Sequence, residues 1–252
     1  MICALAILQA TIVPPVVAQS NQAAQNRPAP PPGVLRHCVN LIGQKRYEQA
    51  RSVLEPLVEQ HPDWPRARFI LALAWHKQSR YEEARTHFEH AIRLDPNDAQ
   101  VYVFYGWCLY YLGEPETART MFEKFLGVQP EYDDALFAIA LIDFDADKLD
   151  QATAGFEKVI ALAVANRRTS MEAKSRARLA DVQIRQKKFD DARKQLNASI
   201  RLNPDNYEAY YKLSRVLTRL GEHDAAEEAL KKHREVKERI RPTSRKERRP
   251  DG

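Results

Sequence analysis

The sequence predicts an all-α protein in which short pairs of helices repeat along the chain as a solenoid. An alanine recurs every 34 residues, at Ala50, Ala84, Ala118 and Ala152. A proline recurs at the same interval, at Pro62, Pro96 and Pro130. A fixed period of this length indicates a stack of small supersecondary units and argues against one globular core.

The residue pattern within one period, 65–98, shows why a helical pair is expected. Apolar or small residues recur at helical spacing in its first half, at Leu71, Ala72 and Trp75. A facing stripe follows in its second half, at Ala84, Phe88 and Ala91. Alanine recurs because two helix backbones approach closely there. Pro96 ends the pair because proline cannot donate the next helical hydrogen bond.

The same register divides most of the chain into six repeats. In order they are 31–64, 65–98, 99–132, 133–166, 173–206 and 207–240. Glycines fall in the turns expected between paired helices, at Gly43, Gly113 and Gly221.

One irregularity interrupts the period after the fourth repeat. The alanine spacing stretches to 40 residues between Ala152 and Ala192 and returns to 34 afterwards. We therefore place a six-residue insertion at 167–172 and expect it to form a lengthened helix end or a surface loop. A Thr-x-x-Glu capping box begins at Thr169, which predicts that the next helix starts near Ser170.

This pattern resembles the tetratricopeptide repeat (TPR) family, in which each 34-residue unit is a pair of antiparallel helices. The family's small-residue position in the first helix holds Cys38, Ala72, Gly106, Ala140, Ala180 and Ser214. The resemblance covers residues 31–240. It implies a right-handed superhelical solenoid of about six TPR helix-turn-helix units.

Residues 1–18 have the pattern of an export signal peptide or its remnant. The apolar run Ile2–Val13 is followed by small residues at Val16 and Ala18, which suit cleavage after Ala18. No Lys or Arg precedes Arg27, so the usual positive amino-terminal region is missing. The run is shorter than the ~20 residues of a membrane-spanning helix, so we expect no transmembrane span. We expect a periplasmic or secreted protein, with a cytoplasmic location as the alternative.

The net charge of +5 lies at the ends of the chain. Residues 237–252 contribute +4 and Arg27 contributes the remaining +1, so the repeats up to residue 236 are neutral overall. We assign 19–33 as a proline-rich linker, 34–240 as the array and 241–252 as a basic disordered tail. A basic groove for nucleic acid is not indicated.

The surface most able to bind a partner is the concave wall that the family's geometry assigns to the first helices. Across the second to fourth repeats this wall carries aromatic rings, at Phe69, Trp107, Tyr110, Tyr111, Phe137 and Phe144. The fifth and sixth repeats are more polar and carry Arg185, Arg215 and Arg219. We predict a peptide-binding groove in which the rings receive apolar side chains and the arginines hold an acidic end or a phosphate.

Other readings of the same rings stay open. The rings could pack between helices as ordinary core and leave no site. The groove could also be filled by the chain's own linker or by a second copy, which would make the protein a self-associating structural module. The basic tail offers a third reading, an adaptor that contacts nucleic acid or anionic membrane.

No residue pattern predicts catalysis, a metal site or a cofactor. Asp143, Asp145 and Asp147 begin like a calcium loop, but the glycine and the bidentate glutamate that such a loop needs are absent. We expect these aspartates to lie in a solvated turn. The sequence therefore predicts a non-catalytic scaffold for protein–protein interaction, within an envelope-associated assembly, whose partner is a protein or peptide.

Overall fold

The computed structural model of the chain describes residues 32–241. These residues form twelve α-helices and no strands, so the predicted all-α fold is confirmed for this part of the chain. The chain divides at Asp98 into two compact units, which are described in turn.

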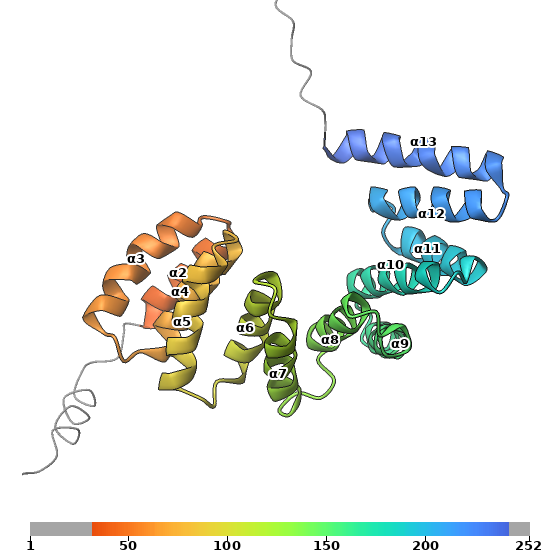
Figure 1. The fold of residues 1–252 in the computed structure, drawn as a ribbon. Helices are drawn as coiled ribbons and strands as arrows, with labels where there is room; N and C mark the ends of the chain where they lie inside the picture. Colours follow the sequence, from red (N-terminus) through yellow and green to blue (C-terminus); the bar gives the residue numbers. More distant parts are fainter. Residues whose placement is uncertain (1–31, 242–252) are drawn as a thin grey trace, which may run out of the picture. The chain divides into compact units, whose positions relative to one another are not determined.

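The first compact unit contains two helical pairs (Figure 1). Its helices are α2 (Pro32–Gly43), α3 (Tyr47–Gln60), α4 (Pro65–Lys77) and α5 (Tyr81–Leu94). Helix α4 packs against both α3 and α5, and α2 packs against α3 and α4. Helix α4 begins at Pro65, where the missing N–H costs no helical hydrogen bond. Fully buried side chains fill the spaces between these helices, among them Leu54, Ile70, Leu71 and Phe88.

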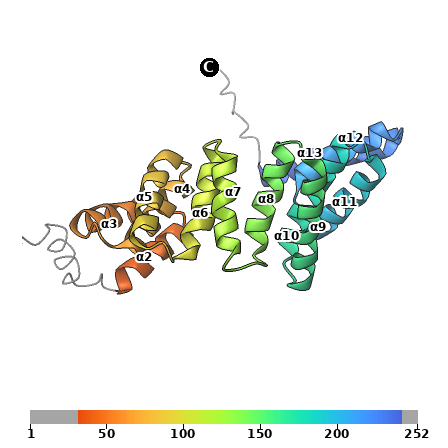
Figure 2. The same ribbon diagram turned by 60° about the horizontal axis from the view of Figure 1, so that its bottom comes forward.

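The second compact unit contains four helical pairs in chain order, and a second view shows the same succession (Figure 2). Its helices are α6 (Ala99–Tyr111), α7 (Pro115–Leu126), α8 (Asp133–Asp145), α9 (Leu149–Ala165), α10 (Thr169–Arg185), α11 (Phe189–Leu202), α12 (Tyr207–Arg219) and α13 (His223–Ile240). Each helix packs against the next one along the chain, and α8 also contacts α10. The first helices of the fourth and fifth repeats therefore meet directly.

The periodic alanines lie in the interior of the helical pairs. Ala50, Ala84, Ala118, Ala152 and Ala192 have no exposed surface. Their complete burial agrees with a period set by packing, because a larger side chain at a fully buried position would require its neighbours to move.

Each repeat turns between its two helices through one residue in the left-handed region. The φ angles lie between 57° and 81°, at Lys45, Ser79, Gly113, Asp147, Lys187 and Gly221. The next residue then donates its N–H to a carbonyl five positions earlier, as Glu114 does to Leu109 at 2.9 Å. This is a Schellman helix end. The predicted turn position of Gly43 was wrong, because that glycine is the last residue of α2 and Lys45 makes the turn.

The extra residues between the fourth and fifth repeats lengthen helices and add no large loop. Helices α9 and α10 have 17 residues each. They are joined through Arg167, which has φ 55°, and the N–H of Arg168 bonds to the carbonyl of Ala163 at 2.7 Å. The connection between two repeats thus has the geometry of the turns within them. Helix α10 begins at Thr169 and its cap residue makes no side-chain hydrogen bond, so the predicted capping box does not form.

Within residues 32–241, no helix combines the length and apolarity required to cross a membrane. The predicted signal peptide and most of the predicted linker lie outside the described residues, as does nearly all of the basic tail.

Candidate functional site

Three aromatic side chains of α6 form a cluster at the surface of the second compact unit. The ring centroid of Trp107 lies 5.7 Å from the ring centroid of Tyr110 and 6.0 Å from that of Tyr111. The centroids of the two tyrosine rings are 5.6 Å apart. Trp107 also packs edge-on against the buried ring of Phe122 at 5.5 Å. Tyr111 is 52% exposed. We call Trp107, Tyr110 and Tyr111 the aromatic cluster.

Two carboxylates of α8 hold the polar ends of this cluster. The Nε1–H of Trp107 donates to Oδ2 of Asp134 at 2.9 Å, and the hydroxyl of Tyr110 donates to Oδ2 of Asp145 at 2.6 Å. Burial raises the pKa of Tyr110 to about 12, and the hydrogen bond to Asp145 adds to the effect. Tyr110 therefore stays protonated and keeps donating across the neutral pH range.

The remaining predicted aromatic residues are buried. Phe137 has no exposed surface and Phe144 is 9% exposed. The ammonium group of Lys174 lies 4.0 Å from the centroid of the Phe137 ring, and burial lowers the pKa of this lysine. Phe69 is 2% exposed and belongs to the first compact unit. Phe69 and Phe137 thus serve as core, whereas the aromatic cluster offers ring surface to a partner.

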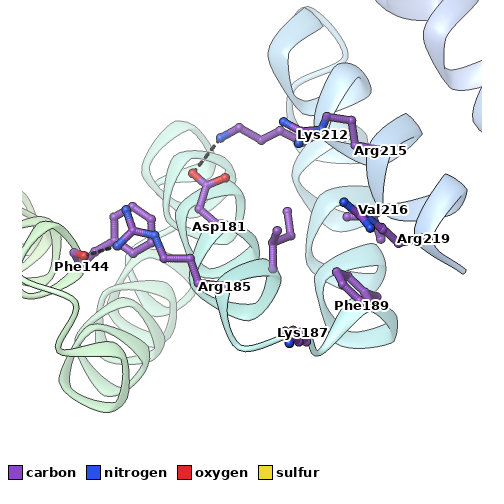
Figure 3. Close-up of a pocket in the computed structure, with 10 residues that line it drawn as sticks. Phe144, Asp181, Arg185, Lys187, Phe189, Lys212, Arg215, Val216 and Arg219 are labelled. Carbon is purple, nitrogen blue, oxygen red and sulfur yellow. Dashed lines mark hydrogen bonds and ion pairs between the residues drawn. The ribbon is translucent and has the colours of Figure 1, made fainter.

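A pocket of about 740 Å³ opens between the C-terminal half of α10, helix α12 and the end of α8 (Figure 3). Its apolar wall consists of Phe144, Ile184, Phe189 and Val216. Five cations and one carboxylate complete the lining, namely Arg185, Lys187, Lys212, Arg215, Arg219 and Asp181. We call this cavity the basic pocket. Its size is that of an ordinary ligand site.

Two of the five cations are already engaged by the protein. The Nη1 of Arg185 donates to the carbonyl of Phe144 at 2.7 Å, and its guanidinium lies 3.8 Å from the centroid of the same ring. Arg185 also approaches Oδ1 of Asp147 at 3.4 Å. Lys212 pairs with Asp181 at 2.7 Å. No carboxylate of residues 32–241 pairs with the other three, which are Lys187, Arg215 and Arg219.

The end of α8 joins the aromatic cluster to the basic pocket. Phe144 lines the pocket, and the next residue, Asp145, accepts the hydrogen bond from Tyr110. The second compact unit therefore carries an exposed ring at Tyr111 on α6 and exposed cations on α10 and α12.

The structure brings together most of the side chains that the sequence predicted for this surface. Phe144, Arg185, Arg215 and Arg219 share the basic pocket, and Trp107, Tyr110 and Tyr111 share the cluster. Sequence reasoning missed Lys212, Lys187 and Phe189. Lys212 lies one helical turn before Arg215, so helix periodicity was the signal for it.

Of the three aspartates at the end of α8, Asp145 and Asp147 are exposed at the solvated turn that we expected, whereas Asp143 is not. Asp143 is buried and pairs with Arg119, while Asp145 and Asp147 contact Tyr110 and Arg185. The expectation of a solvated turn was therefore wrong for Asp143. Within the described part of the chain, no group of three or more His, Cys, Asp or Glu side chains is arranged to hold a metal ion.

Successive helical pairs closed by one kind of turn define a helical-repeat protein. A family model described as "Tetratricopeptide repeat" matches residues 40–99, 106–165 and 177–244, which is more than half of the chain. A second model with the same description matches residues 76–125. The chain belongs to the tetratricopeptide repeat family, as its sequence pattern predicted.

Solved structures of TPR proteins share this fold at low sequence identity. The structure titled "Functional Characterization of Pseudomonas Aeruginosa pilF" matches with a TM-score of 0.67 and 19% identity, over 90% of this chain and 95% of that chain. MamA from Desulfovibrio magneticus RS-1 matches with a TM-score of 0.61 and 20% identity, over 71% and 97% of the two chains.

A third structure is titled "Crystal structure of YrrB: a TPR protein with an unusual peptide-binding site". It matches with a TM-score of 0.54 and 17% identity, over 73% of this chain and 91% of that chain. No curated protein sequence matches this chain. At these identities, the structural matches show the fold alone.

Proposed function

We propose that this protein is a non-catalytic scaffold that binds a segment of a partner protein across α6, α8, α10 and α12. The observation that carries the proposal is the aromatic cluster. Its Tyr111 ring is exposed, and hydrogen bonds hold its Trp107 and Tyr110 rings in place. Exposed aromatic residues are common at the centres of protein interfaces, because they bury much apolar area with few rotatable bonds.

The anchoring hydrogen bonds support a binding role for these rings. Asp134 and Asp145 fix the orientations of Trp107 and Tyr110, so little side-chain entropy remains to be lost on binding. Tyr111 then packs against both fixed rings and presents its face to solvent. The site is therefore organised before a partner arrives.

The family and its known structures agree with this proposal. YrrB, a TPR protein, has a peptide-binding site by its title, which supports peptide binding as a role for this fold. The cluster and the basic pocket of the present chain contain no pairing of a nucleophile with a general base. These observations favour recognition over catalysis.

Affinity capture from native cell extract tests the proposal. The full chain is compared with Tyr111→Ser, which removes an exposed ring, and with the control Val164→Ser, which removes an exposed apolar side chain of equal fractional exposure on α9. We expect a protein that the parent and the control retain and that Tyr111→Ser loses. Equal recovery by all three chains would show that the aromatic cluster is not the site.

We also propose that the protein works outside the cytoplasm, in an envelope-associated assembly. The apolar run and small residues within 1–18 support this proposal. Fractionation of cells that express the full chain with a carboxyl-terminal tag tests it. Recovery of the tag only from the cytoplasmic fraction, at its uncleaved mass, would contradict export.

A further inference from the structure

We propose that the basic pocket binds an acidic peptide segment in which carboxylates flank an apolar side chain. This inference rests on the proposed function, because it names the chemistry of the partner segment. It is carried by the charge and shape of the pocket formed by α8, α10 and α12 (Figure 3).

The wall of the basic pocket has a local excess of positive charge. Five cations and one carboxylate line the pocket, which leaves a formal charge of +4 on its wall. Residues 28–236, which include the whole pocket, carry no net charge, so this excess is a property of one place and not of the whole surface. Like charges held close together destabilise a surface unless a counter-charge is bound, and an acidic ligand supplies one.

The internal ion pairs of the pocket leave specific cations for a ligand. Asp181 neutralises Lys212, and Arg185 is held by the carbonyl and the ring of Phe144. Arg215 and Arg219 have no carboxylate partner in residues 32–241 and lie on α12 one helical turn apart. A guanidinium group binds a carboxylate through two parallel hydrogen bonds, so each arginine suits one acidic side chain.

The cations of the pocket are spread over two of its sides. Arg185 and Lys187 lie on the α10 side of the pocket, and Arg215 and Arg219 lie on the α12 side (Figure 3). Positions four residues apart on one helix are separated by about 6 Å along its axis. Cations spread in this way match several carboxylates placed along a peptide. A single phosphate would instead be bound best by donors that converge on one point.

The apolar wall explains why the segment needs an apolar residue as well. Ile184, Phe189 and Val216 line the same pocket as the cations and give it a hydrocarbon surface. An acidic side chain alone would leave this wall in contact with water, whereas a flanked Leu or Phe would cover it. We therefore expect the motif to alternate acidic and apolar side chains.

Selection from a random-peptide display library tests the inference with the full chain as bait. We expect the selected peptides to be enriched in Asp and Glu next to Leu, Ile, Phe or Met, relative to the starting library. The test variant is Arg215→Gln/Arg219→Gln. The control is Arg201→Gln/Arg234→Gln, which changes the net charge equally at exposed arginines outside the pocket.

A selected peptide, labelled with fluorescein, then gives the affinities. We expect its dissociation constant to rise about tenfold or more in the test variant and less than about twofold in the control, because each lost arginine removes a charge-assisted contact. Replacing each Glu or Asp of the peptide by Gln or Asn is expected to weaken parent binding to the same extent. Added salt should weaken the binding of the unsubstituted peptide to the parent protein.

The outcomes separate this inference from the proposed function. Enrichment of neutral or basic peptides that bind through Tyr111 would show that the basic pocket does not select acidic peptides. The proposed function as a peptide-binding scaffold would then still stand. Enrichment of phosphorylated over carboxylate peptides in a matched phosphoserine set would overturn the carboxylate assignment. A library that yields no binders at all would count against both.

Discussion

The indole Nε1–H of Trp107 on α6 donates a 2.9 Å hydrogen bond to the carboxylate of Asp134 on α8. This bond joins the first helices of two successive repeats and fixes the ring beside Tyr111. We expect Asp134→Ala to lower the free energy of unfolding by about 1–2 kcal/mol, because the half-buried indole loses a charged acceptor. Urea unfolding followed by circular dichroism measures the change.

A matched control separates this bond from a general loss of acidic charge. Glu157→Ala removes an exposed carboxylate from the middle of α9, and we expect its stability to stay within about 0.5 kcal/mol of the parent. Partner capture should also decrease in Asp134→Ala and not in the control. A stability change of the same size in both variants would contradict the role of the hydrogen bond.

The close approach of α8 and α9 provides a second prediction. A Cβ atom added at Gly155 would lie 2.8 Å from Cβ of Ala140 and 3.4 Å from its Cα, so the two backbones would have to separate. We expect Gly155→Ala to lower the free energy of unfolding by about 1–2 kcal/mol, although alanine favours the helix itself. Chemical denaturation measures the effect.

Gly43 is the control for this substitution. Gly43 is also a helical residue, the last one of α2, but nothing lies within 4 Å of a Cβ atom added there. We expect Gly43→Ala to be neutral or to stabilise the protein by up to about 1 kcal/mol, since only helix propensity changes. Equal destabilisation by both substitutions would show that contact between α8 and α9 is not the cause.

Much of the architecture could be predicted from the sequence because the period is a packing requirement. Ala84 and Ala118 recur at the same position of successive repeats, and each is fully buried. The common position of Arg215 and Arg219 in the basic pocket could also be predicted, because residues four apart on one helix lie on the same face.

The exposure of individual rings could not be predicted in this way. Phe137 and Tyr111 lie on the same predicted stripe, but Phe137 packs against Phe156 and Lys174 and has no exposed surface, whereas Tyr111 is half exposed. Which ring a side chain from another repeat covers depends on three-dimensional packing, and the spacing along one helix does not contain it. The partner of Asp143 was unpredictable for the same reason, because Arg119 lies on the preceding helical pair.

The buried imidazole of His76 predicts a dependence of stability on pH. Burial lowers the pKa of His76 from 6.5 to about 4, and the charge of Lys77 adds to the effect. Because the unfolded chain binds the proton more tightly, the stability is complete above the unfolded pKa and is lost as pH falls from 6.5 toward about 4. We expect a loss of about 2 kcal/mol between about pH 7.5 and about pH 5.

Urea unfolding at both pH values measures this loss, and His76→Phe provides the comparison. The phenyl ring can keep the edge contacts with Tyr81 and Phe88 but cannot bind a proton. We therefore expect the variant to lose less stability on acidification than the parent. Burial also lowers the pKa of His87, so some dependence on pH should remain. An identical loss in parent and variant would exclude His76 as its source.

The ion pair between Arg119 on α7 and Asp143 on α8 holds two repeats together in a largely buried setting. Arg119→Ala leaves the carboxylate buried without its counter-charge, and we expect a loss of about 2–3 kcal/mol. The double variant Arg119→Met/Asp143→Leu removes both charges and should recover most of that loss. A thermal or urea unfolding series tests this order of stabilities. A double variant less stable than Arg119→Ala would contradict it.

The Schellman turns predict which surface substitutions should stabilise the protein. Ser79 and Lys45 have φ angles of 60° and 61°, in the region that strains residues with a Cβ atom, whereas Gly113 occupies the equivalent position with φ 80°. We expect Ser79→Gly and Lys45→Gly each to raise the free energy of unfolding by about 0.5–1 kcal/mol, because the relief of strain exceeds the added entropy of the unfolded chain. Gly113→Ala should lower it by about 1 kcal/mol for the converse reason. Urea titrations of the three variants beside the parent measure the changes, and destabilisation by both glycine substitutions would show that the left-handed turn imposes no strain on Ser79 and Lys45.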